Sequence, residues 1–225
     1  DALAETLAST PDAHPRPFKS TVKAYIEAHI EQGPLLEVAS KTIGVVEGIQ
    51  GTRWFDVNVT GESAHAGTTP VAVRKDAFQA GVSVVGLLNA LVANEPDDLR
   101  FTIGRFDVEP NTPNSVAETV SFSIDIRHPS AELVSRVGDA MMDACSGPVG
   151  GCDVSIVEKF NRPPCLFARN IVDTVEAAAT QLGEDHMRMT SGAFHDALFM
   201  NDICATGMIF VPCEGGISHN PRENA

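Results

Sequence analysis

The order of strand and helix patterns between residues 54 and 160 limits the possible folds more than any other feature of this sequence. Apolar and polar residues alternate in four stretches, as expected for strands whose side chains point to opposite faces in turn. Two longer stretches space their apolar residues for one face of a helix. The strands are predicted at 54–60, 101–108, 118–126 and 152–160, and the helices at 73–95 and after Pro129, with Ser130 as N-cap. This β-α-β-β-α-β order is typical of a ferredoxin-like sandwich.

The segments that flank this unit follow a different pattern. After a Pro-Pro pair, a helix is predicted from about residue 171 to 182, with Asn170 as its N-cap and Gly183 at its end. Strand patterns follow at 186–190 and 206–211. The sequence therefore predicts an α/β fold with an inserted domain. Residues 1–45 and 165–225 are predicted to form one α/β layer together, and residues 46–164 form the domain inserted between them.

Composition excludes several classes of partner. The chain has a formal net charge of −14 and no basic stripe that could follow a phosphate backbone, so nucleic acid is not expected to bind. The longest apolar run, 82–93, is too short to span a bilayer and contains Gly86 and Asn89, so no membrane segment is expected. The five cysteines form no CxxC pair, which indicates reduced thiols and a cytoplasmic protein.

The stretch 25-YIEAHIEQGP-34 places ionisable residues on one face of a predicted strand. Its alternation puts three apolar side chains on one side, and Tyr25, Glu27, His29 and Glu31 on the other. A strand in a globular core seldom carries so many ionisable groups in a row, because buried charges need partners. The pattern alone leaves open what these polar side chains contact.

Four of the seven histidines lie at strand ends or beside glycine-bearing turns, where sites are usually built. They are His29, His65, His195 and His219. Each one alone is explained better by a satisfied core or turn histidine, but four together favour a site. Imidazoles suit zinc, nickel or manganese. The sequence contains no GxSxG elbow, Walker loop or GxGxxG fingerprint, so nucleophilic and nucleotide-binding sites have little support.

Six short runs resemble those of one enzyme family. They are 29-HIEQGPLLE-37, 61-GESAHAGTTPVAVRKDA-77, 109-EPNTPNSV-116, 125-DIRH-128, 191-SGAFHDA-197 and 216-GISHNP-221. They are similar to those of the N-carbamoyl-L-amino-acid amidohydrolase, allantoate amidohydrolase and β-ureidopropionase group, within the aminoacylase-like clan of dinuclear metallohydrolases. The resemblance implies an α/β catalytic domain interrupted by a ferredoxin-like lid that also forms a homodimer.

The resemblance also implies two divalent metal ions, which would be Zn, Mn, Ni or Co. His29 resembles a ligand of one ion and His219 a ligand of the other. His65, in the lid, resembles the catalytic residue that steadies the oxyanion, often in the other subunit's site. On this interpretation, the polar face of residues 25–31 points into a metal site.

Four further residues resemble groups that bind the substrate, a small N-carbamoyl or ureido acid. They are Gln32, Asn114, Arg127 and His195. Arg127 would grip the substrate carboxylate through a planar two-pronged contact that a lysine could not reproduce. Taken alone, Arg127 is explained equally well as a surface charge after a strand.

The chain departs from the family pattern in three respects. The family's N-terminal portion carries a histidine ligand, a bridging aspartate, a second carboxylate ligand and a glutamate general base, all upstream of the match. The helix that follows the 216–221 loop in the family is missing as well. With one histidine for each ion, we expect a fragment that binds metal weakly or not at all and is inactive in isolation. Phe194 stands where many relatives carry glycine, and its ring would narrow the pocket or change which substrate fits.

The predicted function is metal-dependent hydrolysis of a linear C–N bond in an N-carbamoyl-L-amino acid or a related ureido acid. Two alternatives stay open. One is an aminoacylase or dipeptidase of the same clan, which would act on acyl or peptidyl substrates. The other is a non-catalytic dimerisation or binding module.

Overall fold

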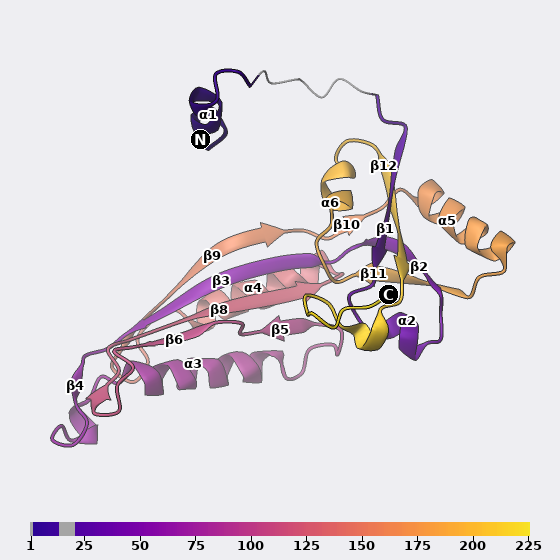
Figure 1. The fold of residues 1–225 in the computed structure, drawn as a ribbon. Helices are drawn as coiled ribbons and strands as arrows, with labels where there is room; N and C mark the ends of the chain where they lie inside the picture. Colours follow the sequence, from indigo (N-terminus) through magenta and orange to yellow (C-terminus); the bar gives the residue numbers. More distant parts are fainter. Residues whose placement is uncertain (1, 14–20) are drawn as a thin grey trace.

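The computed structural model describes residues 2–13 and 21–225, whose strands form two five-stranded sheets and one two-stranded sheet (Figure 1). The first sheet contains β1 (Ala24–Ile30), β2 (Ile43–Ile49), β10 (Cys165–Leu166), β11 (His186–Ser191) and β12 (Ala205–Val211). The second contains β3 (Gly51–Thr60), β5 (Arg100–Thr102), β6 (Phe106–Glu109), β8 (Thr119–His128) and β9 (Asp153–Arg162), while β4 (Ala64–His65) pairs with β7 (Ser115–Val116). The helices are α1 (Ala2–Ser9), α2 (Leu35–Val38), α3 (Ala77–Val92), α4 (Ala131–Ala144), α5 (Arg169–Leu182) and α6 (Asp196–Met200), with 3-10 turns η1 (Val71–Val73) and η2 (Glu214–Gly216). The predicted mixed α/β class is confirmed.

In the first sheet, β12 lies between β1 and β2. It runs parallel to β1 and antiparallel to β2, which in turn runs parallel to β11. The apolar side chains of β2 and β12 are buried, and they include Val45, Val46, Met208 and Phe210, while α5 covers one face of these two strands. This packed centre fixes the strands, so that the loops at their ends hold defined positions.

The second sheet is antiparallel, with β8 and β3 at its centre, β9 at one edge, and the short strands β5 and β6 along the other side of β8. One face is buried under α3 and α4, where Phe55, Phe122 and Ile126 belong to a single core with residues of both helices. The opposite face carries Trp54 and Arg127, which remain partly exposed. That this unit serves as a ferredoxin-like lid stays a prediction.

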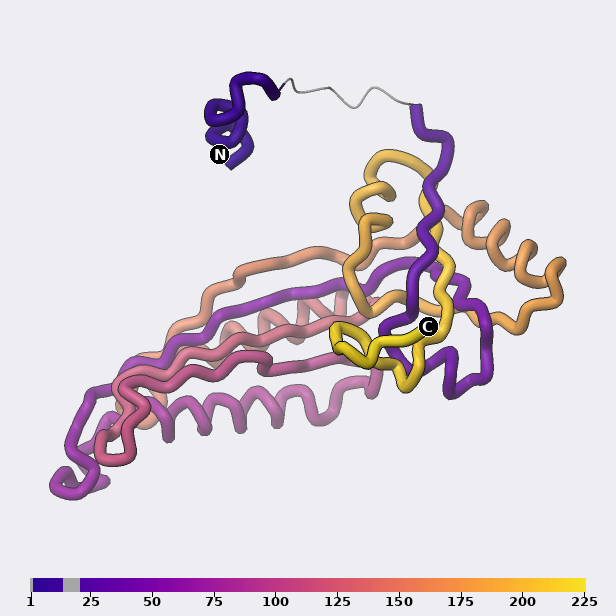
Figure 2. The backbone as a smooth tube through the Cα atoms, in the orientation of Figure 1, coloured from indigo at the N-terminus to yellow at the C-terminus, as the bar shows by residue number. Residues whose placement is uncertain are grey.

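The chain passes from the first sheet to the second at Gln50 and returns before β10, and the two crossings touch (Figure 2). A Cβ atom at Gly48 would lie 2.2 Å from the carbonyl oxygen of Cys165, and one at Gly51 would lie 2.7 Å from Cδ of Pro164. Both positions therefore require glycine. The first crossing falls after residue 46, the predicted start of the insertion, because β2 stays paired in the first sheet up to Ile49. The division into domains stays a prediction.

Local capping explains where several helices begin and end. Ser130 caps α4 as predicted, since its hydroxyl accepts a backbone N–H of the first turn, and Gly183 ends α5 in a left-handed conformation with a φ of 74°. The helix predicted at 73–95 begins only at Ala77, because the carboxylate of Asp76 caps it. Among the described helices, none is long and apolar enough to cross a membrane.

Two other boundary predictions are wrong. α5 begins at Arg169, so Asn170 lies inside the helix, because the carbonyl of Ala168 already accepts the first helical N–H groups. The strand predicted at 101–108 is divided into β5 and β6, because the hydroxyl of Ser123 accepts the N–H of Arg105 between them. In the first case the deciding hydrogen bonds lie close together in the sequence, and in the second the bond joins residues 18 apart in the chain.

A buried arginine ties α4 to the second sheet. The guanidinium of Arg53 contacts the carboxylate of Glu158 on β9 at 2.5 Å and that of Asp139 on α4 at 2.8 Å, and it donates to the Ser135 carbonyl at 2.9 Å. A Cβ atom at Gly138 would lie 2.4 Å from Nη1 of Arg53. The absence of a side chain at Gly138 is therefore what lets α4 approach the arginine.

We expect Gly138→Ala to lower the free energy of unfolding by about 1–3 kcal/mol, since the new methyl group must displace a guanidinium that several partners hold. Gly86→Ala, in α3, is the matched control, because a Cβ atom there meets nothing within 4 Å. That control should raise the free energy of unfolding by about 0.5–1 kcal/mol. Urea denaturation followed by circular dichroism measures both variants, and equal effects would contradict this account of Gly138.

Candidate functional site

Strand β1 turns its polar face towards the protein and its apolar face outwards. Tyr25, Glu27 and His29 are half-buried, whereas Ile26 is 49% exposed and Ala28 is also exposed. The reason is α6, which lies against β1 and presents the N–H of Ala197 to Glu27 at 2.7 Å. The polar face noted in the sequence is thus the face that packs against α6.

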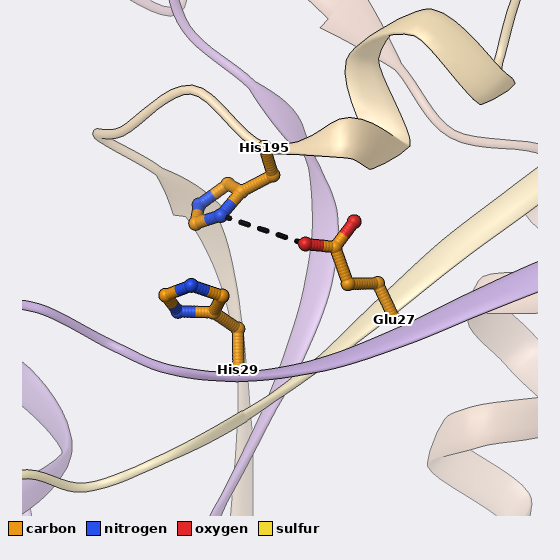
Figure 3. Close-up of side chains that lie close together, drawn as sticks. All are labelled: Glu27, His29 and His195. Carbon is orange, nitrogen blue, oxygen red and sulfur yellow. Dashed lines mark ion pairs between the residues drawn. The ribbon is translucent and has the colours of Figure 1, made fainter.

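Glu27, His29 and His195 form a cluster between β1 and the loop that precedes α6 (Figure 3). One possible ligand atom from each residue lies within 4.8 Å of the others. The imidazole rings of His29 and His195 meet edge to face, with their centroids 4.7 Å apart. Nδ1 of His195 lies 3.9 Å from Oε1 of Glu27. The structure therefore brings together two of the predicted histidines and adds Glu27.

The hydrogen bond of His29 fixes which of its nitrogens is available. Nδ1 lies 2.9 Å from the carbonyl oxygen of Ile30, and a carbonyl can only accept, so Nδ1 carries the proton. In the neutral imidazole this leaves Nε2 with a free lone pair. Metal-binding histidines commonly show this arrangement, because the second nitrogen fixes the orientation of the ring. His29 therefore fits the predicted role of metal ligand.

The other two members of the cluster have partners within the protein. Oε2 of Glu27 accepts the N–H of Ala197, and the Tyr25 hydroxyl lies 3.3 Å from it. Nε2 of His195 lies 2.8 Å from the hydroxyl of Ser191. These contacts suit residues that hold His29 and its surroundings in place better than residues that would give up their partners to a metal.

His195 is only 6% exposed, and its environment keeps it neutral. Burial, which has the largest effect, and the nearby imidazole of His29 together lower its pKa to about 4. At neutral pH the ring therefore donates one hydrogen bond and accepts another instead of carrying a positive charge.

A second pair of predicted residues meets where the loop after β1 touches the C-terminal loop. Nε2 of Gln32 lies 3.3 Å from Nε2 of His219. Both residues have positive φ angles, 60° for Gln32 and 55° for His219, so both loops bend sharply here. A Cβ atom at Gly216 would lie 2.7 Å from the nitrogen of Pro34, which shows how closely the loops pack.

Glu31 shapes the first of these loops. It is 7% exposed, and its two carboxylate oxygens accept the N–H groups of Leu35 and Leu36 at 2.8 Å each. It therefore satisfies the start of α2, whose N-cap residue, Pro34, makes no side-chain cap. Glu31 fixes the turn that carries Gln32.

Arg127 lies at the end of β8 and contacts the loop that carries His195. Its Nη1 donates to the carbonyl oxygen of Gly192 at 2.9 Å, and its guanidinium carbon lies 5.5 Å from the centre of the Phe194 ring. The side chain is 25% exposed and pairs with Asp125 at 2.7 Å. Arg127 is therefore an anchored group at the junction of the two sheets and more than a solvated surface charge.

The structure does not bring His65 and Asn114 to these residues within one chain. They lie together at β4 and β7, where the N–H of Ala66 donates to the Asn114 carbonyl at 3.0 Å. Nδ1 of His65 accepts the N–H groups of Gly67 and Thr68. Figure 1 shows β4 at the far end of the second sheet from the first sheet. Their predicted roles therefore need a second chain.

We expect His195 to make folding stability depend on pH. Its pKa is 6.5 when exposed and about 4 in the fold, so its contribution is complete above about pH 6.5 and is lost as the pH falls towards 4. Between about pH 7 and pH 4.5, wild type should lose about 2–3 kcal/mol more stability than His195→Gln. Urea denaturation with a chelator present measures this, and parallel losses in both proteins would show that His195 is not kept neutral.

Comparison with known proteins places this geometry in a family. The model of peptidase family M20/M25/M40 matches residues 3–225. The N-carbamoyl-L-amino-acid amidohydrolase of Pseudomonas sp. (strain NS671) is 35% identical over 205 residues, which are 90% of this chain and 50% of that protein. The allantoate amidohydrolase of Bacillus subtilis (strain 168) is 34% identical over 208 residues, 92% of this chain and 50% of the relative. The chain thus spans about half the length of the curated relatives it matches.

A solved structure agrees with these relatives. The crystal structure of an amidase of the hydantoinase/carbamoylase family from Burkholderia multivorans superimposes with a TM-score of 0.84 at 36% identity, covering 99% of this chain and 55% of that one. Both the sequence match and the shared fold extend over nearly the whole chain. The chain therefore belongs to peptidase family M20/M25/M40.

Proposed function

We propose that this chain is part of a metal-dependent amidohydrolase that cleaves a linear C–N bond in an N-carbamoyl-L-amino acid or a related ureido acid. The observation that carries the proposal is His29, whose Nε2 is left free beside the loop on which Arg127 is anchored. A metal ligand and a carboxylate-binding group would then approach one small molecule from two sides. Relatives named N-carbamoyl-L-amino-acid amidohydrolase and allantoate amidohydrolase support the choice of substrate class.

Two metal ions, Zn, Mn, Ni or Co, are part of the proposal. His29 would hold one through Nε2, and His219 would hold the other. Divalent ions in such a site polarise the substrate carbonyl and lower the pKa of water. One imidazole for each ion does not complete a coordination shell, so the proposal requires further ligands for each ion.

The chain's own polar groups would bind and orient the substrate. Arg127 would grip its carboxylate, and the amide of Gln32 would contact the carbamoyl group beside His219. His195, neutral and buried, would hold the surroundings of His29 and contact the substrate as an uncharged group. Asn114 and His65 would complete the site, with His65 stabilising the developing oxyanion.

The position of His65 leads to a proposed homodimer. Because His65 and Asn114 lie at the far end of the second sheet, they would act in the site of a partner chain, brought there by twofold symmetry. We also place the protein in the cytoplasm, which fits its five free cysteines.

The test of the function uses the complete product of the gene that encodes this chain, loaded with Zn or Mn. We expect ammonia release from N-carbamoyl-L-amino acids or allantoate and no turnover of N-acetyl amino acids or dipeptides. Turnover of acyl or peptidyl substrates alone would support an aminoacylase or dipeptidase. No turnover of any of these would support a non-catalytic module.

Arg127→Lys tests the carboxylate contact in that protein. It keeps the charge but loses the two-pronged geometry, so we expect kcat/KM to fall about ten-fold to a hundred-fold, or roughly 1.5–3 kcal/mol. The loss should appear with a free carboxylate and nearly vanish with the carboxamide analogue. An equal loss on both substrates would assign Arg127 a structural role.

Mixing two inactive variants tests the dimer. His65→Ala and His29→Ala should each abolish turnover, and their co-expression should restore about a quarter of wild-type activity, since half of the dimers are mixed and each contains one intact site. Activity that stays absent after co-expression would contradict a site shared between subunits.

A further inference from the structure

Phe194 makes contacts that link its loop to the second sheet. The loop between β11 and α6 belongs to the first sheet, yet the Phe194 ring lies 6.0 Å from the Trp54 ring and 5.5 Å from the Phe160 ring. Both contacts are edge to face, and Trp54 and Phe160 also pack on each other at 4.9 Å. Three aromatic residues from β3, β9 and the loop thus form one cluster beside Arg127.

The hydrogen bonds of Arg127 leave a defined part of its guanidinium free. A guanidinium has five N–H donors. Nε and Nη2 donate to the carboxylate of Asp125, and Nη1 donates to the carbonyl of Gly192. Both terminal nitrogens therefore keep one N–H each, which is what a two-pronged contact with another carboxylate uses.

Asp125 alone does not fix where that free end points. It sits two residues before Arg127 on the same strand, so the pair can tilt together on the sheet. The two remaining contacts, the Gly192 carbonyl and the Phe194 ring, both come from the loop that carries His195. An aromatic ring against the guanidinium limits its tilt, and Trp54 and Phe160 limit the movement of that ring.

We propose that Phe194 is a positioning residue, which holds the guanidinium of Arg127 at a fixed place relative to His195 and thereby sets the strength of carboxylate binding. The proposal rests on the proposed function of Arg127 as the carboxylate-binding group. It predicts that loss of the ring resembles a partial loss of Arg127 and affects only ligands with a carboxylate.

An arginine–aromatic contact could also serve only to hold the two sheets together. The chain offers a matched control for that role. Arg162 on β9 lies over the ring of Phe199 on α6, with 5.9 Å between the guanidinium carbon and the ring centre. This pair also links the second sheet to the first, but it does not involve Arg127. Phe199→Leu therefore removes an arginine–aromatic contact between the sheets and leaves the Arg127 contact intact.

The kinetic test compares Phe194→Leu, Phe194→Tyr and Phe199→Leu in the complete gene product. With N-carbamoyl-L-phenylalanine we expect Phe194→Leu to raise KM and lower kcat/KM about three-fold to thirty-fold, with kcat nearly unchanged. Phe194→Tyr, which keeps the ring, should behave like wild type. With N-carbamoyl-L-phenylalaninamide all three variants should match wild type. Combined with Arg127→Lys, Phe194→Leu should add little further loss, since both act through one contact.

A binding test does not depend on turnover. Trp54 is the only tryptophan of this chain and lies in the aromatic cluster, so its fluorescence reports ligands that bind beside Arg127. We expect N-carbamoyl-L-phenylalanine, but not its amide, to change the fluorescence of the 225-residue chain, with a weaker affinity in Phe194→Leu and an unchanged one in Phe199→Leu.

The outcomes separate the inference from the proposed function. If carboxylate binding shows this pattern but no carbamoyl or ureido compound is hydrolysed, the function fails and the positioning role stands. If Phe194→Leu leaves carboxylate binding unchanged, or weakens carboxylate and amide equally, the positioning role is overturned. A loss equal to that of Phe199→Leu would likewise overturn it and leave Phe194 as a contact that only joins the sheets.

Discussion

The carboxylate of Glu27 is the constraint on which the candidate site depends. It is turned towards the protein, where its side chain is 15% exposed, and a carboxylate in that position must find donors. It finds them in the N–H of Ala197 at the start of α6 and in the hydroxyl of Tyr25. By holding α6 against β1, Glu27 places the loop from Gly192 to His195 over the strand that carries His29, and the same loop then reaches Arg127 on the second sheet.

How much of this followed from the sequence depends on the distance over which each interaction acts. Ser130 and Gly183 were predicted correctly because a cap is decided by a few neighbouring residues. The polar face of residues 25–31 stood out in the sequence, and the fold places Glu27 and His29 beside His195 there. The pattern did not show that this face is more buried than the apolar one, because that depends on α6. Asn170 failed as a cap because Ala168 already accepts the helical N–H groups.

The histidines also show which features follow from local sequence and which follow only from the fold. Sequence motifs named His29, His195 and His219, and the fold brings the first two into contact and sets the third beside Gln32. The contacts of Phe194 with Trp54 and Phe160 could not be predicted, since they join residues far apart in the chain and on different sheets.

His65 shows a further limit of prediction from one sequence. Arg127 lies eight residues from Thr119, where β8 begins, so about 27 Å of strand separates it from the end of the sheet where β4 and β7 lie, and no small substrate spans that length. A site that uses both residues is a property of an assembly, which one sequence does not display.

The contact between the two crossings at Gly48, Gly51 and Pro164 has a consequence for how this chain can be engineered and can evolve. Since Cys165 pairs with Ile49 and Leu166 with Gly48, the strands that enter and leave the second sheet already lie side by side as an antiparallel pair. Residues 51–162 could thus be cut out and the ends rejoined by a short hairpin turn, or a foreign module spliced in, with the pairing of β2 and β10 kept. Any inserted module would have to enter and leave through this junction, where Gly48 and Gly51 lack the side chains that would push the two segments apart.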